Sequence, residues 1–168
     1  ASASTVPFYD TFGIDGNLDG SNGWSVAGSG SAIAANGVAE LTDIAVSNVF
    51  DATENKVTIK FELQPVFSES PPAIPEDTTV AFYIDTNGLV VAYDGTTVSN
   101  LTHVPLSESS STNIQVDIDY TSTSWSLTVG SAEVATDFSF YSNSVTAFTQ
   151  MLIAEGSTST STVDNVDI

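Results

Sequence analysis

The stretch VDIDYTSTSWSLTVGSAEVATDFSF, residues 116–140, decides the fold class of this chain. Two of its runs alternate apolar and polar side chains with a period of two residues, which is typical of antiparallel strands with one buried face. The apolar positions are Val116, Ile118 and Tyr120 in the first run and Trp125, Leu127 and Val129 in the second. Gly130 and Ser131 mark a turn, and a third run ends at Phe138 and Phe140. The stretch therefore predicts a meander with one dry and one wet face.

The rest of the sequence repeats this pattern of short apolar runs separated by turn residues, and helical periodicity is nearly absent. We expect strands at 8–12, 24–27, 31–35, 37–41, 45–50, 56–65, 79–85, 89–93, 97–101, 113–120, 124–129, 132–138, 147–154 and 161–168. Asn87-Gly88 and Asp94-Gly95 indicate two tight hairpins. Many short strands with turns between them predict an all-β chain that folds as a two-sheet antiparallel jelly-roll sandwich.

The chain has the length of one domain. Its 168 residues can form one well-packed core, so we expect a single β-sandwich over 1–168. Residues 66–77, rich in proline and acidic residues, predict a loop that lies over a sheet edge or forms a contact surface. Residues 1–7 read as an N-terminal extension.

Three motifs, taken in order along the chain, resemble the concanavalin A-like, laminin-G-type family of secreted β-sandwich proteins. They are FYDTF at 8–12 followed by Trp24, the meander at 116–140, and VDNVDI at 163–168. The resemblance implies a concanavalin A-like sandwich whose first and last strands lie side by side. It also implies glycan binding, often with calcium.

Charge excludes several classes of partner. The chain has 21 acidic and two basic side chains, for a formal net charge of -19. Such a surface repels phosphate backbones and anionic lipids, so we expect neither nucleic-acid binding nor membrane-surface binding. No apolar run approaches the roughly 20 residues of a membrane helix, so we expect no membrane insertion. Cysteine is absent, which excludes disulfides and thiolate sites.

The sequence favours a location outside the cell or on its surface. It opens with small residues and no Met, as a chain processed by signal peptidase would. It has no Arg, and its only lysines are Lys56 and Lys60, so trypsin-like proteases find few sites. A halophilic cytosolic protein would also be acidic and is the alternative.

Two candidate cation sites emerge. Asp15, Asn17 and Asp19 before Gly20 match the first half of a calcium loop, in which alternate oxygen ligands converge on one hard cation. The second half fails, because Val26 stands where an EF-hand needs Glu, and a solvated turn is the alternative. A rival site pairs Asp10 with Asp164, which the resemblance brings together at the terminal strands. The sequence thus leaves two alternatives open, a structural calcium ion at one of these sites or solvated turns without a cation.

Catalysis is not expected. Glucanases related to this fold carry alternating carboxylates on one strand, and the nearest match here is Asp117-Ile-Asp119 with both Glu positions missing. His103 is the sole histidine and has no triad spacing around it, so a surface or edge-strand position is favoured over a catalytic base.

Aromatic side chains are the usual surfaces on which sugars stack. Trp24 and Trp125 share strand faces with aliphatic residues and read as core. The candidate carbohydrate-binding residues are instead Tyr93, Asp94, Tyr141 and Asn143.

Two functions remain. The favoured one is a secreted structural subunit that assembles with copies of itself into a filament or surface layer, with strand addition at the N-terminus. The assembling residues would be Ala1, Ser2, Ala3, Ser4, Thr5, Val6 and Pro7. The alternative is a calcium-dependent carbohydrate-binding module or adhesin domain, with glycans as partners.

Overall fold

A computed structural model describes residues 3–52, 55–67 and 72–168. These residues form strands connected by turns and loops, and none of them is helical. The strands are β1 (Tyr9–Asp10), β2 (Gly16–Asn17), β3 (Trp24–Ala27), β4 (Ser31–Ala35), β5 (Val38–Thr42), β6 (Ile44–Val49), β7 (Lys56–Gln64), β8 (Phe82–Ile84), β9 (Val90–Asp94), β10 (Thr97–Asn100), β11 (Thr112–Asp119), β12 (Ser124–Val129), β13 (Ala132–Ser139), β14 (Gln150–Glu155) and β15 (Ser161–Asp167). The all-β prediction is confirmed.

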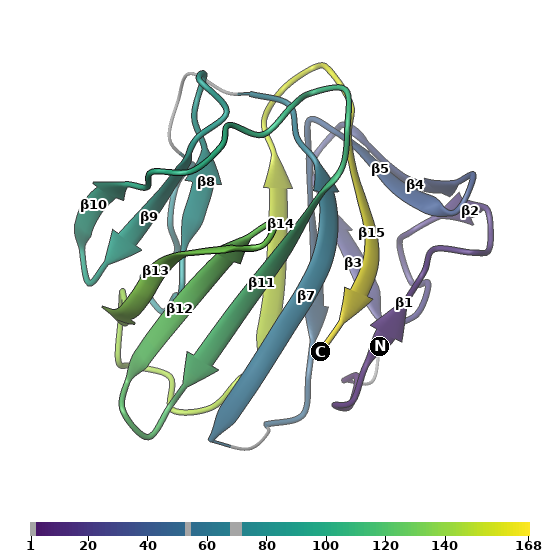
Figure 1. The fold of residues 1–168 in the computed structure, drawn as a ribbon. Coiled ribbons are helices and arrows are strands. Elements are labelled where there is room, and N and C mark those ends of the chain that lie inside the picture. The colour runs from purple at the N-terminus through teal and green to yellow at the C-terminus, as the bar shows by residue number, and fades with distance from the viewer. Residues whose placement is uncertain (1–2, 53–54, 68–71) are drawn as a thin grey trace.

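The strands form one broad sheet and two small ones, all with antiparallel strand pairs. The broad, nine-stranded sheet runs β13-β12-β11-β7-β15-β5-β4-β2, and β1 pairs with β15 outside this path. The small sheets are β10-β9-β8 and β14-β6-β3. In Figure 1 the long strands β12, β11, β7 and β15 lie in front, β3 and β14 lie behind them, and β8, β9 and β10 are seen at the upper left. The molecule is therefore a sandwich whose second layer is divided into two parts.

The predicted meander is the centre of the broad sheet. Val116 lies opposite Leu127 and Ile118 lies opposite Trp125 across β11 and β12. All four side chains are buried, because the period-two alternation sends them toward the second layer. Trp125 stacks on Phe82 of β8 with ring centroids 6.3 Å apart, so its indole joins the two layers.

The first and last strands lie side by side, as the resemblance implies. Tyr9 pairs with Asp167 and Asp10 with Val166. The register of β15 against β7 shifts between Asp164 and Asp167, and Asn165 in this bulge has a φ of 49°. The bulge lets β15 bond to β7 and to β1 along one short segment.

Several predicted bounds need correction. The strand predicted at 79–85 is only Phe82–Ile84, and the one at 147–154 begins at Gln150. The strand predicted at 8–12 is limited to Tyr9–Asp10, because Phe12 turns the backbone to a φ of 50°. β2 was not predicted, because Gly16-Asn17 reads as a turn.

The predicted N-terminal extension lies against its own chain in the described part. Ser4 forms a parallel bridge with Phe50, donates its N–H to Val49 O at 2.8 Å and accepts from Asp51 N. The Ser4 hydroxyl donates to Oδ1 of fully buried Asn48 at 2.7 Å. Val6 packs against the core, whereas Ala3 is half-buried and Thr5 and Pro7 are exposed. Ala1 and Ser2 lie outside the described residues.

The predicted loop at 66–77 includes residues 68–71, which are also outside the described part. At its start, Phe67 donates its N–H to Oε1 of Glu108 at 2.8 Å, and its ring packs against the core. In the described part of the chain, no helix has the length and apolar character needed to cross a membrane.

Candidate functional site

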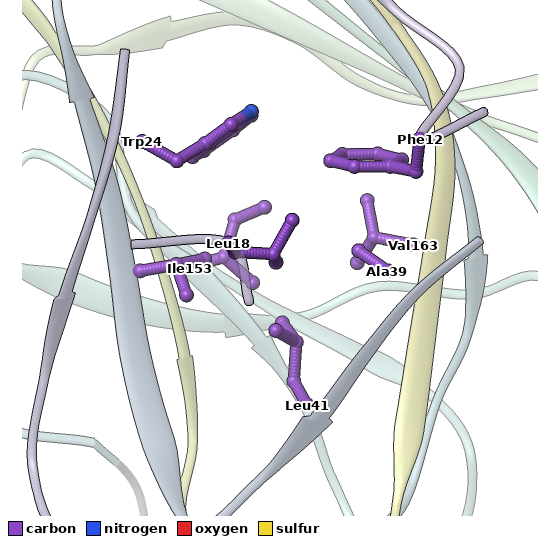
Figure 2. A pocket seen from close by; sticks show the side chains of 8 residues that line it. Phe12, Leu18, Trp24, Ala39, Leu41, Ile153 and Val163 are labelled. Atoms are coloured by element: carbon purple, nitrogen blue, oxygen red, sulfur yellow. The ribbon is translucent and has the colours of Figure 1, made fainter. Parts of the chain in front are cut away.

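One pocket in the interior of the sandwich is a gap between packed core side chains. Figure 2 shows this pocket, which is lined only by apolar side chains. They are Phe12, Leu18, Trp24, Ala39, Leu41, Val46, Ile153 and Val163. The space leaves no room for a water molecule, and the lining residues belong to the core. This pocket therefore has no space for a ligand.

Three tyrosines meet on the sheet formed by β8, β9 and β10. Tyr93 of β9 and Tyr141, which follows β13, have ring centroids 5.4 Å apart and an interplanar angle of 88°. Tyr83 of β8 lies close enough to Tyr93 to affect the pKa of its phenol. All three side chains are partly exposed. We call Tyr83, Tyr93 and Tyr141 the tyrosine cluster.

The cluster lies on the side of this sheet that faces away from the core. Phe82 stacks on Trp125, so Phe82 and its partner Ala92 face inward. Alternation then turns Tyr83 and Tyr93 outward. Val98 of β10 lies opposite Tyr93 and is 50% exposed. The outward face therefore carries aromatic and apolar groups at the surface.

Backbone contacts between distant segments hold the cluster together. Ser139 donates its N–H to Oδ1 of Asp94 at 2.8 Å, and Gly95 donates its N–H to Ser139 O at 3.0 Å. Tyr141 donates its N–H to Thr79 O at 2.9 Å. The end of β13 is thus fixed against β9, and this contact brings Tyr141 to Tyr93.

Tyr93 has a raised pKa in this cluster. Burial raises the pKa of Tyr93 above its usual value, and the neighbouring phenols of Tyr83 and Tyr141 raise it further. Among the described residues, none of the three hydroxyls makes a hydrogen bond to another protein group. A tyrosine side chain offers both a ring face and a hydrogen-bonding hydroxyl.

The predicted carbohydrate-binding residues have different positions. Tyr93 and Tyr141 are in edge-to-face contact, and sugar binding at them stays a prediction. Asp94 lies at the end of β9 and anchors Ser139 through its carboxylate. Asn143 is exposed in the loop after Tyr141. Tyr83 was not predicted as a site residue. It alternates with Phe82 and Ile84 along β8, and the sequence does not show which face of this strand is covered by the core.

The predicted cation ligands Asp15, Asn17 and Asp19 each accept a backbone hydrogen bond. Asp15 Oδ1 accepts from Asn36 N at 3.2 Å, and Asn17 Oδ1 accepts from Asp19 N at 2.9 Å. Asp19 Oδ1 accepts from Val26 N at 3.1 Å. These bonds fix the turns around β2, and calcium binding here stays a prediction.

Asp10 serves Trp24. Its Oδ2 accepts from Trp24 Nε1 at 2.8 Å and from Asn22 Nδ2 at 3.0 Å, and its Oδ1 accepts from Phe12 N at 2.8 Å. Trp24 is 1% exposed, so the carboxylate satisfies a donor at the edge of the core.

Asp164, the other predicted ligand, lies in the β15 bulge near Asp10 and Glu62. Asn165 donates its N–H to Asp164 Oδ1 and its amide Nδ2 to both Asp164 Oδ2 and Glu62 Oε2. Burial raises the pKa of Asp164, and repulsion from Glu62 and Asp10 raises it further, while the Asn165 N–H lowers it. Within the described residues, no three His, Cys, Asp or Glu side chains are grouped to hold a metal.

The groups considered for catalysis are occupied by structural contacts. Val90 donates its N–H to His103 Nε2 at 2.9 Å, so Nδ1 carries the proton and donates to Val104 O at 2.7 Å. Asp117 accepts from Thr58 Oγ1 and Gln115 Nε2. Asp119 lies 3.1 Å from Lys56 Nζ, and this contact lowers the pKa of Asp119.

Comparison with known proteins supports the fold and gives no family. No family model matches the chain, and no curated protein matches it. Among solved structures, a sialidase is similar with a TM-score of 0.64 and 11% identity over 94% of this chain. The chain spans only 18% of that sialidase. The globular domain of T. cruzi calreticulin is similar with a TM-score of 0.49 and 9% identity, covering 95% of this chain and 86% of the calreticulin chain. The similarity to the sialidase supports a two-sheet antiparallel β-sandwich of jelly-roll type, consistent with a concanavalin A-like fold.

Proposed function

We propose that this chain is a non-catalytic carbohydrate-binding module that holds a sugar on the tyrosine cluster. The observation that carries the proposal is the contact of Tyr93 with Tyr141 on an outward-facing sheet surface. Sugar rings have apolar faces that pack on aromatic rings, and their hydroxyls bond to phenolic hydroxyls. The β-sandwich fold is compatible with this function and supports it only at the level of the fold. We also propose that the protein is secreted.

The test is binding of soluble polysaccharides by isothermal titration calorimetry. Tyr93→Ala should weaken binding by about five- to thirtyfold, because a stacking contact of about 1–2 kcal/mol is removed. Tyr9→Ala is the matched control, since Tyr9 is 60% exposed and lies on β1 beside the broad sheet. Equal affinity of Tyr93→Ala and wild type for every bound polysaccharide would refute the proposed site.

Self-assembly is the second candidate function, and the outer face of β14-β6-β3 favours it. The outward residues of this face are uncharged in a chain of net charge -19. They are Gln150, Leu152 and Ala154 of β14, Ala45, Ser47 and Val49 of β6, and Ser25 and Ala27 of β3. Leu152 and Val49 are 49% and 52% exposed. A second copy could approach this flat face without bringing carboxylates into contact.

Light scattering tests the assembly proposal, with electron microscopy on the same samples. Wild type should form oligomers at high salt, and Leu152→Glu should remain monomeric because it places a charge in the face. Leu152→Gln, which is polar and uncharged, is the control for lost apolar area. A wild-type protein that stays monomeric at every salt concentration would refute assembly through this face. Repeating the wild-type measurement with calcium and then chelator tests the predicted structural ion.

A further inference from the structure

The charge distribution of the molecule restricts the kind of sugar that the tyrosine cluster can accept. Lys56 and Lys60 are the only lysines in the chain, and it has no arginine. Both lysines belong to β7 in the broad sheet, and Lys56 is paired with Asp119. The sheet β10-β9-β8 and the loop that carries Tyr141 therefore have no cationic side chain.

The remaining basic group near this sheet is His103, whose two ring nitrogens both take part in hydrogen bonds to the backbone. His103 lies beside β9, where its Nε2 accepts from the Val90 N–H. The charged groups nearest to the cluster in sequence are the carboxylates of Asp85 and Asp94.

An anionic sugar would meet an unfavourable potential at this surface. Proteins hold sugar carboxylates and sulfates with Arg or Lys, or with clustered N–H donors. Here the sugar would approach a molecule of net charge -19, with no cation on the receiving face to offset the repulsion. An uncharged sugar loses nothing to this potential.

We propose that the tyrosine cluster recognises uncharged glycans and excludes those that carry sialic acid, uronic acid or sulfate. This inference rests on the proposed carbohydrate-binding function and names its ligand class. Specificity of this kind comes from the penalty on the wrong ligand as well as from contacts to the right one.

The experiment is a glycan array in which each uncharged glycan is printed beside the same glycan capped with sialic acid or sulfate, followed by calorimetry on soluble pairs. The expected result is binding of uncharged members, with the capped members weaker by about tenfold or more at low salt. Raising the salt concentration should narrow this difference, because the exclusion is electrostatic.

A gain-of-function variant separates electrostatic exclusion from a simple steric block. Val98→Lys places a cation opposite Tyr93, and it should reduce the preference for the uncharged member of each pair several-fold. Val98→Gln, of similar polarity without the charge, should leave the preference unchanged. A preference that Val98→Lys does not alter would overturn the electrostatic explanation.

The remaining outcomes separate the inference from the function on which it rests. Capped glycans that bind as well as uncharged ones, with affinity lost in Tyr93→Ala, would overturn the inference and leave the carbohydrate-binding function standing. Absence of binding to any glycan, or binding that Tyr93→Ala does not affect, would overturn both.

Discussion

At the scale of single residues, carboxylates near the surface of this acidic chain act as hydrogen-bond acceptors for donors at the edge of the core. Asp10 is the clearest case, because it accepts from the indole of Trp24, the amide of Asn22 and the N–H of Phe12. The sequence could mark Asp10 as a candidate ligand from the resemblance. It could not show that Trp24, 14 residues away, supplies the donor that the carboxylate satisfies.

Removal of the Asp10 carboxylate should destabilise the protein. Asp10→Ala leaves the Trp24 N–H without its partner, and we expect the free energy of unfolding to fall by about 1–3 kcal/mol. Urea denaturation followed by circular dichroism measures this change. Asp77→Ala removes one negative charge from an exposed position and should change stability little. Equal midpoints for the two variants would show that the Asp10 contacts contribute nothing.

Asp164 should make stability depend on pH in the direction opposite to that of a salt-bridged carboxylate. Its pKa is raised in the folded protein, so the folded state holds the proton more tightly than the unfolded chain does. The associated stability is present below the unfolded pKa and is lost as the pH rises through the folded pKa. Ionised Asp164 therefore costs stability at neutral pH.

Asp164→Asn should be at least as stable as wild type at about pH 7 and should gain less on acidification to about pH 4. Thermal melts across this range give the comparison. Other carboxyl groups also contribute to the pH dependence, because burial raises the pKa of Glu155 and Lys56 lowers the pKa of Asp119. The contribution of Asp164 is therefore the difference in melting temperature between the variant and wild type at each pH. Parallel pH profiles would contradict the role given to Asp164.

At the scale of elements, alternation of apolar and polar residues was sufficient to predict the long strands. β11 and β12 lie where the alternation of 116–140 places them, and the hairpin at Asp94-Gly95 joins β9 to β10 as its turn residues predict. Short strands were less predictable, because pairing partners far along the chain determine their limits. β2 is the example, since Gly16-Asn17 becomes a strand only beside Ala34 and Ile33 of β4.

The candidate site was predictable only in part for the same reason. Tyr93 and Tyr141 could be selected as exposed aromatics beside turns. Their contact depends on Asp94 and Ser139, which are 45 residues apart, and the outward orientation of Tyr83 depends on which face Trp125 covers. Alternation places side chains on two faces of a strand and does not say which face is buried.

The connection between β4 and the preceding strand requires a glycine at position 30. A Cβ at Gly30 would overlap the backbone carbonyl oxygens of Thr42 and Asp43, where β5 ends before β6. Because backbone atoms cannot move aside as a flexible side chain can, Gly30→Ala should cost about 2 kcal/mol or more. Gly156→Ala is the matched control, since nothing lies within 4 Å of its added Cβ. Equal unfolding midpoints for the two variants would contradict the close packing at Gly30.

At the scale of the whole molecule, charge opposes the compact state. The chain has a net charge of -19. Among the described side chains, Lys56 and Asp119 form an ion pair that neutralises one of the carboxylates. Unpaired carboxylates repel one another, and this repulsion is weaker when salt screens it.

Added salt should therefore stabilise the protein. We expect the melting temperature to rise by several degrees between about 0.02 M and about 0.5 M sodium chloride, over which the Debye length falls from roughly 20 Å to a few ångströms. Differential scanning calorimetry at fixed protein concentration is the measurement. A melting temperature that does not change, or that falls, would show that the carboxylates are already neutralised in the fold.

The central claim is that the tyrosine cluster binds carbohydrate, and calorimetric titration of one uncharged glycan from the array into three proteins tests it most directly. We predict saturable binding by wild type and by Tyr9→Ala with the same affinity, and an affinity about five- to thirtyfold lower for Tyr93→Ala. Binding that is equal in all three proteins, or absent from the wild type for every glycan, would contradict it.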